Sequence, residues 1–277
     1  MARTDHSKLY ALGRRAALVA GLACAAACND PLQTGTTTTT PTNGSPAGIW
    51  TGVDSATGMQ MIGMINSGGL ADFFLSNGEQ FVGTAQVAGT ALAISLDGYT
   101  QVGAQFSDGS TFGVGTFNGT LASGSTISGT LTFTTSDNTA VTSTWSLSFS
   151  SLYDTAPTLD SIAATYADST TAVSAGNDPL GGASVTISSN GTLFAQGSPN
   201  GCVLNGTLST SDTSANLFEV AYSYASCTGT YAILNGLKFS GLAYVNSSDS
   251  PAQIVIAVTA QSSSDGDYGV VTDLTAS

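Results

Sequence analysis

The sequence predicts an all-β protein with two tandem antiparallel meander domains, which are small up-and-down β-barrels or alternatively β-sandwiches. Two observations from residue 48 onward predict this class. Apolar and polar residues alternate with a period of two, and turns rich in Gly, Asn, Asp and Ser interrupt them roughly every 10 to 14 residues. A third observation, an internal repeat, predicts two copies of one domain. One face of each strand is apolar and the other polar, which favours antiparallel over parallel sheets.

The first 27 residues have the pattern of a signal peptide. Arg3, Lys8, Arg14 and Arg15 precede a 12-residue apolar stretch, residues 16–27, that ends in small side chains. Twelve helical residues rise about 18 Å, which is too short for a hydrocarbon core of about 30 Å. We therefore expect an exported protein and no permanent spanning helix.

Residues 25–28, Ala-Ala-Ala-Cys, resemble the lipobox of bacterial lipoproteins, although the usual Leu is absent. The resemblance implies a lipid anchor on Cys28. Cys24 is a rival lipidation site, and ordinary cleavage after Ala27 would give a soluble secreted protein. Cysteine parity favours Cys28, because Cys202 and Cys227 then remain as a pair in an oxidising compartment.

Residues 28–47 are predicted to be the lipidated N-terminus and a disordered linker, because residues 31–47 are rich in Thr, Pro and Gly and lack apolar periodicity. The expected location is the bacterial cell envelope, anchored at the outer membrane on its periplasmic or surface face. Asn29 lacks the aspartate that holds some lipoproteins at the inner membrane, but Asp30 leaves the inner membrane open.

Two β domains are expected at residues 48–154 and 159–277. The clearest alternation is in residues 141–149, where Ser143, Trp145 and Leu147 share one face and small polar residues occupy the other. The repeat has an offset of about 123 residues. Residues 65–69 match residues 187–191, residues 77–84 match residues 200–207, and residues 117–119 match residues 239–241.

The first domain opens with Gly48-Ile49-Trp50-Thr51, which resembles the Gly-x-Trp opening of lipocalins and the Gly-x-Trp-Thr opening of avidins. The resemblance covers four residues and has no counterpart at residues 161–164. It implies a barrel and does not identify a ligand.

Cys202 and Cys227 are predicted to form a disulfide. Each lies at one end of a predicted strand, so pairing of the two strands as a hairpin makes the cysteines neighbours. A loop of this length would stabilise the fold by roughly 3 to 4 kcal/mol. A reactive cysteine dyad is the alternative, but the spacing is unlike Cys-x-x-Cys.

The charge distribution excludes several functions. Cleavage before Cys28 leaves 17 acidic side chains and one basic residue, Lys238, which is a formal balance of -16. Nucleic acid is a poor partner for such a chain. The only histidine, His6, lies in the leader, and the chain beyond the leader contains no arginine. Histidine-based catalysis and arginine phosphate clamps are therefore absent from the exported chain.

We predict no enzyme activity, no catalytic residues, no cofactor and no metal site. Glu79 and Glu219 both look like ordinary solvated positions, and Lys238 is expected to face solvent. Trp50 and Trp145 are interpreted as core or barrel-lining residues. The expected function is binding of a small apolar or saccharide ligand, or of an envelope partner, through residues that the sequence does not identify. The alternative is a structural or adhesive surface protein.

Overall fold

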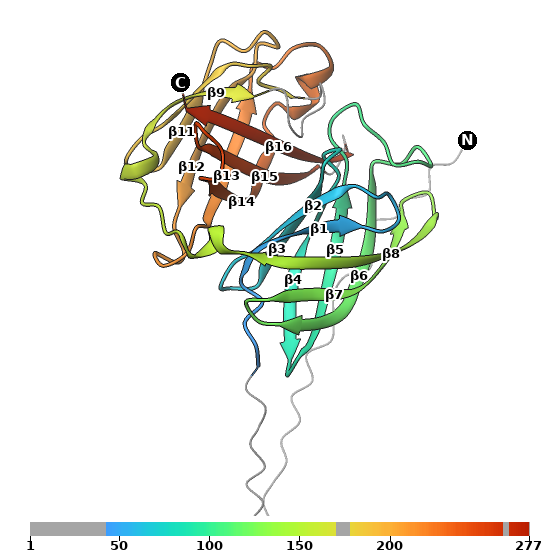
Figure 1. Cartoon of the computed structure of the whole chain (residues 1–277). Coiled ribbons are helices and arrows are strands. Elements are labelled where there is room, and N and C mark those ends of the chain that lie inside the picture. The colour runs from blue at the N-terminus through green and yellow to red at the C-terminus, as the bar shows by residue number, and fades with distance from the viewer. Residues whose placement is uncertain (1–42, 170–177, 263–265, 277) are drawn as a thin grey trace, which may run out of the picture. The chain divides into compact units, whose positions relative to one another are not determined.

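The computed structural model describes residues 43–169, 178–262 and 266–276, which form two closed antiparallel β-barrels in tandem (Figure 1). Each barrel is an eight-stranded meander, so the predicted all-β class is confirmed and the sandwich alternative is wrong. In this described part of the chain, no helix is long and apolar enough to cross a membrane. The predicted signal peptide, Cys24, Cys28 and residues 29–42 lie outside the described residues.

The first barrel, here called barrel 1, winds in chain order and closes by pairing its last strand with its first. Its strands are β1 (Gly48–Asp54), β2 (Gln60–Ile65), β3 (Leu70–Leu75), β4 (Gln80–Ala88), β5 (Ala91–Tyr99), β6 (Phe112–Ala122), β7 (Thr126–Thr135) and β8 (Ala140–Ser150). Two short 3-10 helices follow, η1 (Ser151–Asp154) and η2 (Asp160–Ile162).

The second barrel, here called barrel 2, repeats this order and closes by pairing β16 with β9. Its strands are β9 (Ala164–Ser169), β10 (Ser184–Ile187), β11 (Thr192–Ala195), β12 (Val203–Ser209), β13 (Phe218–Ala225), β14 (Lys238–Asn246), β15 (Gln253–Ser262) and β16 (Gly266–Ala276). A 3-10 helix, η3 (Gly229–Leu234), connects β13 to β14.

The internal repeat corresponds to equivalent strands in the two barrels. Its first match joins the ends of β2 and β10, its second the starts of β4 and β12, and its third places Phe117 in β6 and Phe239 in β14. These are the second, fourth and sixth strands of their barrels. The predicted common strand order is therefore confirmed.

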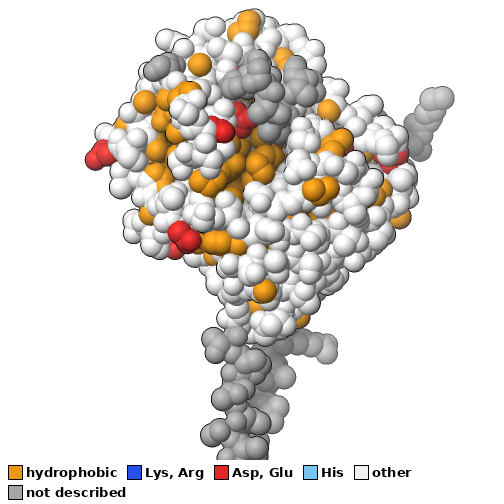
Figure 2. All heavy atoms as spheres, in the orientation of Figure 1, with side chains coloured by type: hydrophobic (Ala, Val, Ile, Leu, Met, Phe, Trp, Pro, Cys, Tyr) orange, Lys and Arg blue, Asp and Glu red, His pale blue; other side chains and the backbone are white. Residues whose placement is uncertain are grey.

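Side-chain alternation builds each core. In β8, Ser143, Trp145 and Leu147 are buried while Thr142 and Thr144 are exposed, which is the predicted pattern. Inward-facing residues of each barrel form one hydrophobic cluster. Outward-facing positions are largely uncharged, and the face in Figure 2 shows only isolated acidic side chains. The described outer surface therefore presents mainly uncharged side chains.

The strands of barrel 1 alternate in direction, so its loops gather at two opposite ends. The β1–β2, β3–β4, β5–β6 and β7–β8 loops form the end that we call the open end. The remaining loops form the closed end, where β1 begins. There Trp50 is fully buried and donates from Nε1 to the Pro46 carbonyl at 3.1 Å, while the Gly44 N–H donates to the Gly89 carbonyl at 3.3 Å.

Both barrels belong to one compact unit. A third hydrophobic cluster contains Met64 and Phe74 of barrel 1 together with Leu242 and Val255 of barrel 2. On the same outer face of β3, Asp72 is completely buried, and neither of its carboxyl oxygens has a hydrogen-bond partner in the described structure. Burial raises the pKa of Asp72 well above its usual value.

Candidate functional site

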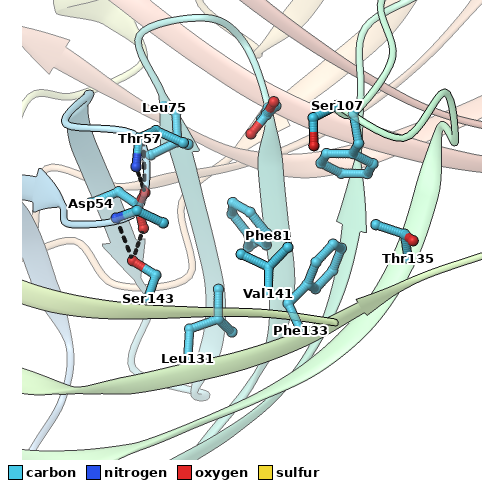
Figure 3. A pocket seen from close by; sticks show the side chains of 13 residues that line it. Asp54, Thr57, Leu75, Phe81, Ser107, Leu131, Phe133, Thr135, Val141 and Ser143 are labelled. Carbon is cyan, nitrogen blue, oxygen red and sulfur yellow. Dashed lines mark hydrogen bonds between the residues drawn. The ribbon is translucent and has the colours of Figure 1, made fainter. Parts of the chain in front are cut away.

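The open end of barrel 1 contains a cavity of ≈ 140 Å³ (Figure 3). An engineered apolar cavity of about 150 Å³ is large enough to hold benzene, so this volume fits one ring or a short alkyl chain. The lining is mainly apolar and consists of Asp54, Ala56, Thr57, Leu75, Glu79, Phe81, Phe106, Ser107, Leu131, Phe133, Thr135, Val141 and Ser143.

Three phenylalanines form an aromatic wall in this cavity. The Phe133 ring packs edge-on against Phe81 and Phe106, with centroid distances of 5.3 and 5.4 Å. Phe81 in turn lies 5.7 Å from Trp145, which is fully buried and stacks on Phe117. An occupant that contacts Phe81 is therefore one ring away from Trp145, a natural fluorescent reporter.

A pair of glycines positions the Phe133 ring. Gly98 of β5 is paired with Gly113 of β6, and Phe133 of β7 lies over both. A Cβ on Gly98 would lie 2.5 Å from the ring, and one on Gly113 would lie closer still. The absence of two side chains therefore makes room for the ring at the cavity wall.

Asp54, the last residue of β1, is an anion whose acceptor positions are occupied. Its Oδ1 accepts hydrogen bonds from Ser143 Oγ and from Trp145 Nε1, the latter at 2.9 Å. Its Oδ2 accepts from the Thr57 N–H at 2.9 Å and from Thr57 Oγ1 at 2.7 Å. Burial acts to raise the pKa of Asp54, but these hydrogen bonds outweigh it and hold the pKa below its usual value. Asp54 is therefore charged at neutral pH.

Glu79 lies in the β3–β4 loop and is only partly exposed, so its interpretation as an ordinary solvated residue is wrong. Burial raises the pKa of Glu79, a hydrogen bond from Asn77 partly offsets this effect, and the negative charge of Asp54 raises the pKa further. The two carboxyl groups that line the cavity thus have pKa values shifted in opposite directions.

Acidic residues of barrel 1 gather at its open end. Asp54, Glu79, Asp108 and Asp137 lie in or next to the four loops there, whereas the three closed-end loops contain no acidic residue. Asp108 accepts hydrogen bonds from Ser110 and from Thr135, a cavity residue, and these lower its pKa. Residues 43–169 contain no Lys, Arg or His to offset these charges.

In the described part of barrel 2, aromatic side chains pack the interior. The rings of Tyr222 and Tyr224 pack against Phe239 at 5.4 and 5.5 Å, and all three side chains are buried. The Tyr224 hydroxyl donates to that of Tyr222 at 3.3 Å. The space beside Tyr222 and Leu204 measures only ≈ 10 Å³, which is too small for a ligand.

The structure places the other predicted residues as follows. Cys202 and Cys227 form a disulfide at the base of the β12–β13 hairpin, as predicted. Lys238 and Glu219 are exposed on barrel 2, and Asn66 of barrel 1 donates to Glu219 at 3.1 Å. None of the four lies at the cavity.

Among the described residues, no group of three or more His, Cys, Asp or Glu is arranged to hold a metal ion. Compared with known protein families and with curated proteins, the chain shows no match. The inference of function therefore depends on the cavity itself.

Proposed function

We propose that this protein is a non-enzymatic binding protein of the cell envelope, and that the open end of barrel 1 holds a small, mainly apolar ligand. The observation that carries the proposal is the contrast between the ≈ 140 Å³ aromatic-lined cavity in barrel 1 and the ≈ 10 Å³ space among the described interior residues of barrel 2. Ligand sites in proteins are typically concave and apolar with a few polar groups, and this cavity fits that description.

The lining favours an apolar ligand over a saccharide. Phe81, Phe106 and Phe133 supply rings without hydrogen-bonding groups, and Leu75, Leu131 and Val141 supply aliphatic surface. A sugar would bury several hydroxyls here with few partners, which costs free energy for each one left unpaired. A purely structural role would not require such a cavity.

Anchoring through Cys28 is part of the proposal and has its own test. The cationic leader, the lipobox-like residues and the Thr-rich linker support it. In cell fractionation, we expect Cys28→Ser to move the protein from the membrane fraction to the soluble fraction. Cys24→Ser is the matched control and should leave it in the membrane fraction. A wild-type chain recovered soluble and unacylated would contradict the anchor.

Binding is tested by titrating the protein with neutral one-ring compounds, such as toluene and benzyl alcohol. A Trp50→Phe background leaves Trp145 as the single tryptophan, whose emission can be excited selectively over that of the tyrosines. We expect saturable changes in Trp145 emission, and we expect Val141→Phe, which fills the cavity, to weaken binding at least about tenfold because the cavity loses its volume.

Val114→Phe is the matched control, because Val114 lies on β6 of the same barrel with its side chain 52% exposed and away from the cavity. This variant should bind like the parent. Equal binding by the parent and by Val141→Phe would place the ligand elsewhere, and no saturable binding of any compound would contradict the proposed function.

A second candidate function, hydrolysis by a carboxyl pair, is favoured by one observation. The pKa of Asp54 is lowered and that of Glu79 is raised, which is the pattern of a carboxylate and an acid in glycosidases. Against it, the oxygens of Asp54 already accept four hydrogen bonds. Turnover of aryl glycosides that Glu79→Gln abolishes would establish hydrolysis in place of simple binding.

A further inference from the structure

We propose that the preferred ligand of barrel 1 is an organic cation, a protonated amine joined to a ring or short alkyl group, with its apolar part in the cavity and its charge beside Glu79. This inference rests on the proposed function and adds a ligand class to it. It comes from three features of the cavity: its aromatic wall, the chemistry of its two carboxyl groups and the one-sided charge of the open end.

The aromatic wall suits a cation as well as an apolar ring. Phe133 packs edge-to-face with Phe81 and with Phe106, so the cluster presents rings in more than one orientation to the cavity. The face of an aromatic ring carries negative charge density, and a cation within about 6 Å of the ring centroid is attracted to it. A neutral ligand gains only the burial of its apolar surface.

The two carboxyl groups have different roles toward a cation. Both oxygens of Asp54 are occupied by donors from Ser143, Trp145 and Thr57, so this group supplies a fixed negative field rather than a free acceptor. Glu79 is the lining carboxyl group with acceptor capacity left for a ligand, because a carboxylate has about four acceptor positions and, among the described residues, Asn77 is the side chain that hydrogen-bonds to it. An ammonium group, which has only donors, matches this arrangement.

The charge of the open end excludes anions and attracts cations. Asp54 and Glu79 line the cavity, Asp108 and Asp137 lie in the β5–β6 and β7–β8 loops at the same end, and residues 43–169 contain no basic side chain. A carboxylate or phosphate ligand would meet only like charge and find no Lys or Arg as a partner. Clefts lined by one sign of charge raise the local concentration of opposite charge.

The test compares three probes with one ring each, benzylamine, benzyl alcohol and benzoate, by calorimetry and by Trp145 emission in the Trp50→Phe protein. We expect benzylamine to bind at least about tenfold more tightly than benzyl alcohol, a difference of about 1.4 kcal/mol. Benzoate should bind more weakly than either. Glu79→Gln should remove most of the advantage of benzylamine over benzyl alcohol, because the variant lacks the negative charge that attracts the ammonium group.

Glu219→Gln is the matched control, because Glu219 is the other glutamate of the chain and is exposed on barrel 2. It should leave all three affinities unchanged. If benzyl alcohol binds and benzylamine binds no more tightly, the cation proposal is overturned and the binding function remains. If Glu79→Gln reduces both affinities equally, Glu79 only shapes the cavity and the proposal is again overturned. If no probe binds, the proposed function itself fails.

Discussion

Barrels 1 and 2 have the same number and order of strands, yet barrel 1 encloses a cavity of ≈ 140 Å³, whereas the space beside Tyr222 among the described residues of barrel 2 measures only ≈ 10 Å³. In barrel 1 the three phenylalanines at the open end pack against one another and line a ≈ 140 Å³ space. In barrel 2, Tyr222, Tyr224 and Phe239 occupy the interior. Strand order therefore determines the barrel fold, whereas the size of the interior cavity depends on a few large side chains.

The two barrels are also stabilised by different interactions. Barrel 2 carries the Cys202–Cys227 disulfide, whereas the sequence of barrel 1 contains no cysteine and relies on packing around Trp50 and Trp145. Barrel 2, with its packed interior and its disulfide, is suited to stabilising the protein rather than to binding a ligand. We expect perturbations of barrel 2 to change stability and perturbations of the open end of barrel 1 to change binding.

The largest expected effect is on barrel 2. The Cys202→Ser/Cys227→Ser variant should lose roughly 3 to 4 kcal/mol of unfolding free energy, because the bond closes a loop of 25 residues in the unfolded chain. Denaturant unfolding measures this loss. Reductant should destabilise the wild type in the same way and leave the variant unaffected. A loss under about 1 kcal/mol would show that the bond does not set the stability of barrel 2.

An intermediate effect is expected at the glycine pair of barrel 1. Gly98→Ala should cost about 1 to 3 kcal/mol and weaken ligand binding, because the new methyl group displaces the Phe133 ring. Gly68→Ala is the control, since a Cβ there meets only Asn66 Oδ1, at 3.3 Å. If Gly98→Ala binds and unfolds like the wild type, Phe133 does not depend on the glycine pair for its position.

A smaller effect is expected from pH. The pKa of Asp168 in barrel 2 is raised to about 8. Burial is the largest cause, followed by a hydrogen bond with Asp178 and repulsion from its charge. Between about pH 4 and pH 8 the folded state keeps a proton that the unfolded state releases, so stability falls as pH rises, by at most about 1.4 kcal/mol per pH unit. The fall ends above about pH 8.

Asp168→Asn should flatten this slope in unfolding measurements between pH 4 and pH 8. Part of the slope should remain, because the pKa of Asp273 is raised to about 6, chiefly by burial, with the same sign. Asp160→Asn, at an exposed position, is the control and should keep the wild-type slope. An unchanged slope in Asp168→Asn would show that Asp168 does not hold the proton.

Much of the fold could be predicted from local sequence patterns. Alternation in residues 141–149 predicted β8, and repeated turns predicted a common strand order. Barrel closure could not be separated from a sandwich, because the β1–β8 pairing joins residues about a hundred positions apart and leaves no local signal.

The candidate site was missed for a similar reason. Glu79 follows an Asn-Gly turn and looks solvated in sequence, but it lines a cavity together with residues such as Asp54 of β1 and Phe133 of β7, which are distant in sequence. The clustering of acidic residues in alternate loops was the available signal. Successive loops of a meander lie at alternate ends of the barrel. The predicted strand order therefore places the loops that contain or adjoin Asp54, Glu79, Asp108 and Asp137 at the same end.

The direction of β1 determines how the cavity is presented. β1 runs from Gly48 at the closed end to Asp54 at the cavity, and seven strand residues span roughly 23 Å. Residues 43–47, the described residues before Gly48, therefore lie at the end of barrel 1 opposite the opening, where the Gly44 N–H donates to the Gly89 carbonyl. The cavity and the described start of the chain therefore lie at opposite ends of barrel 1.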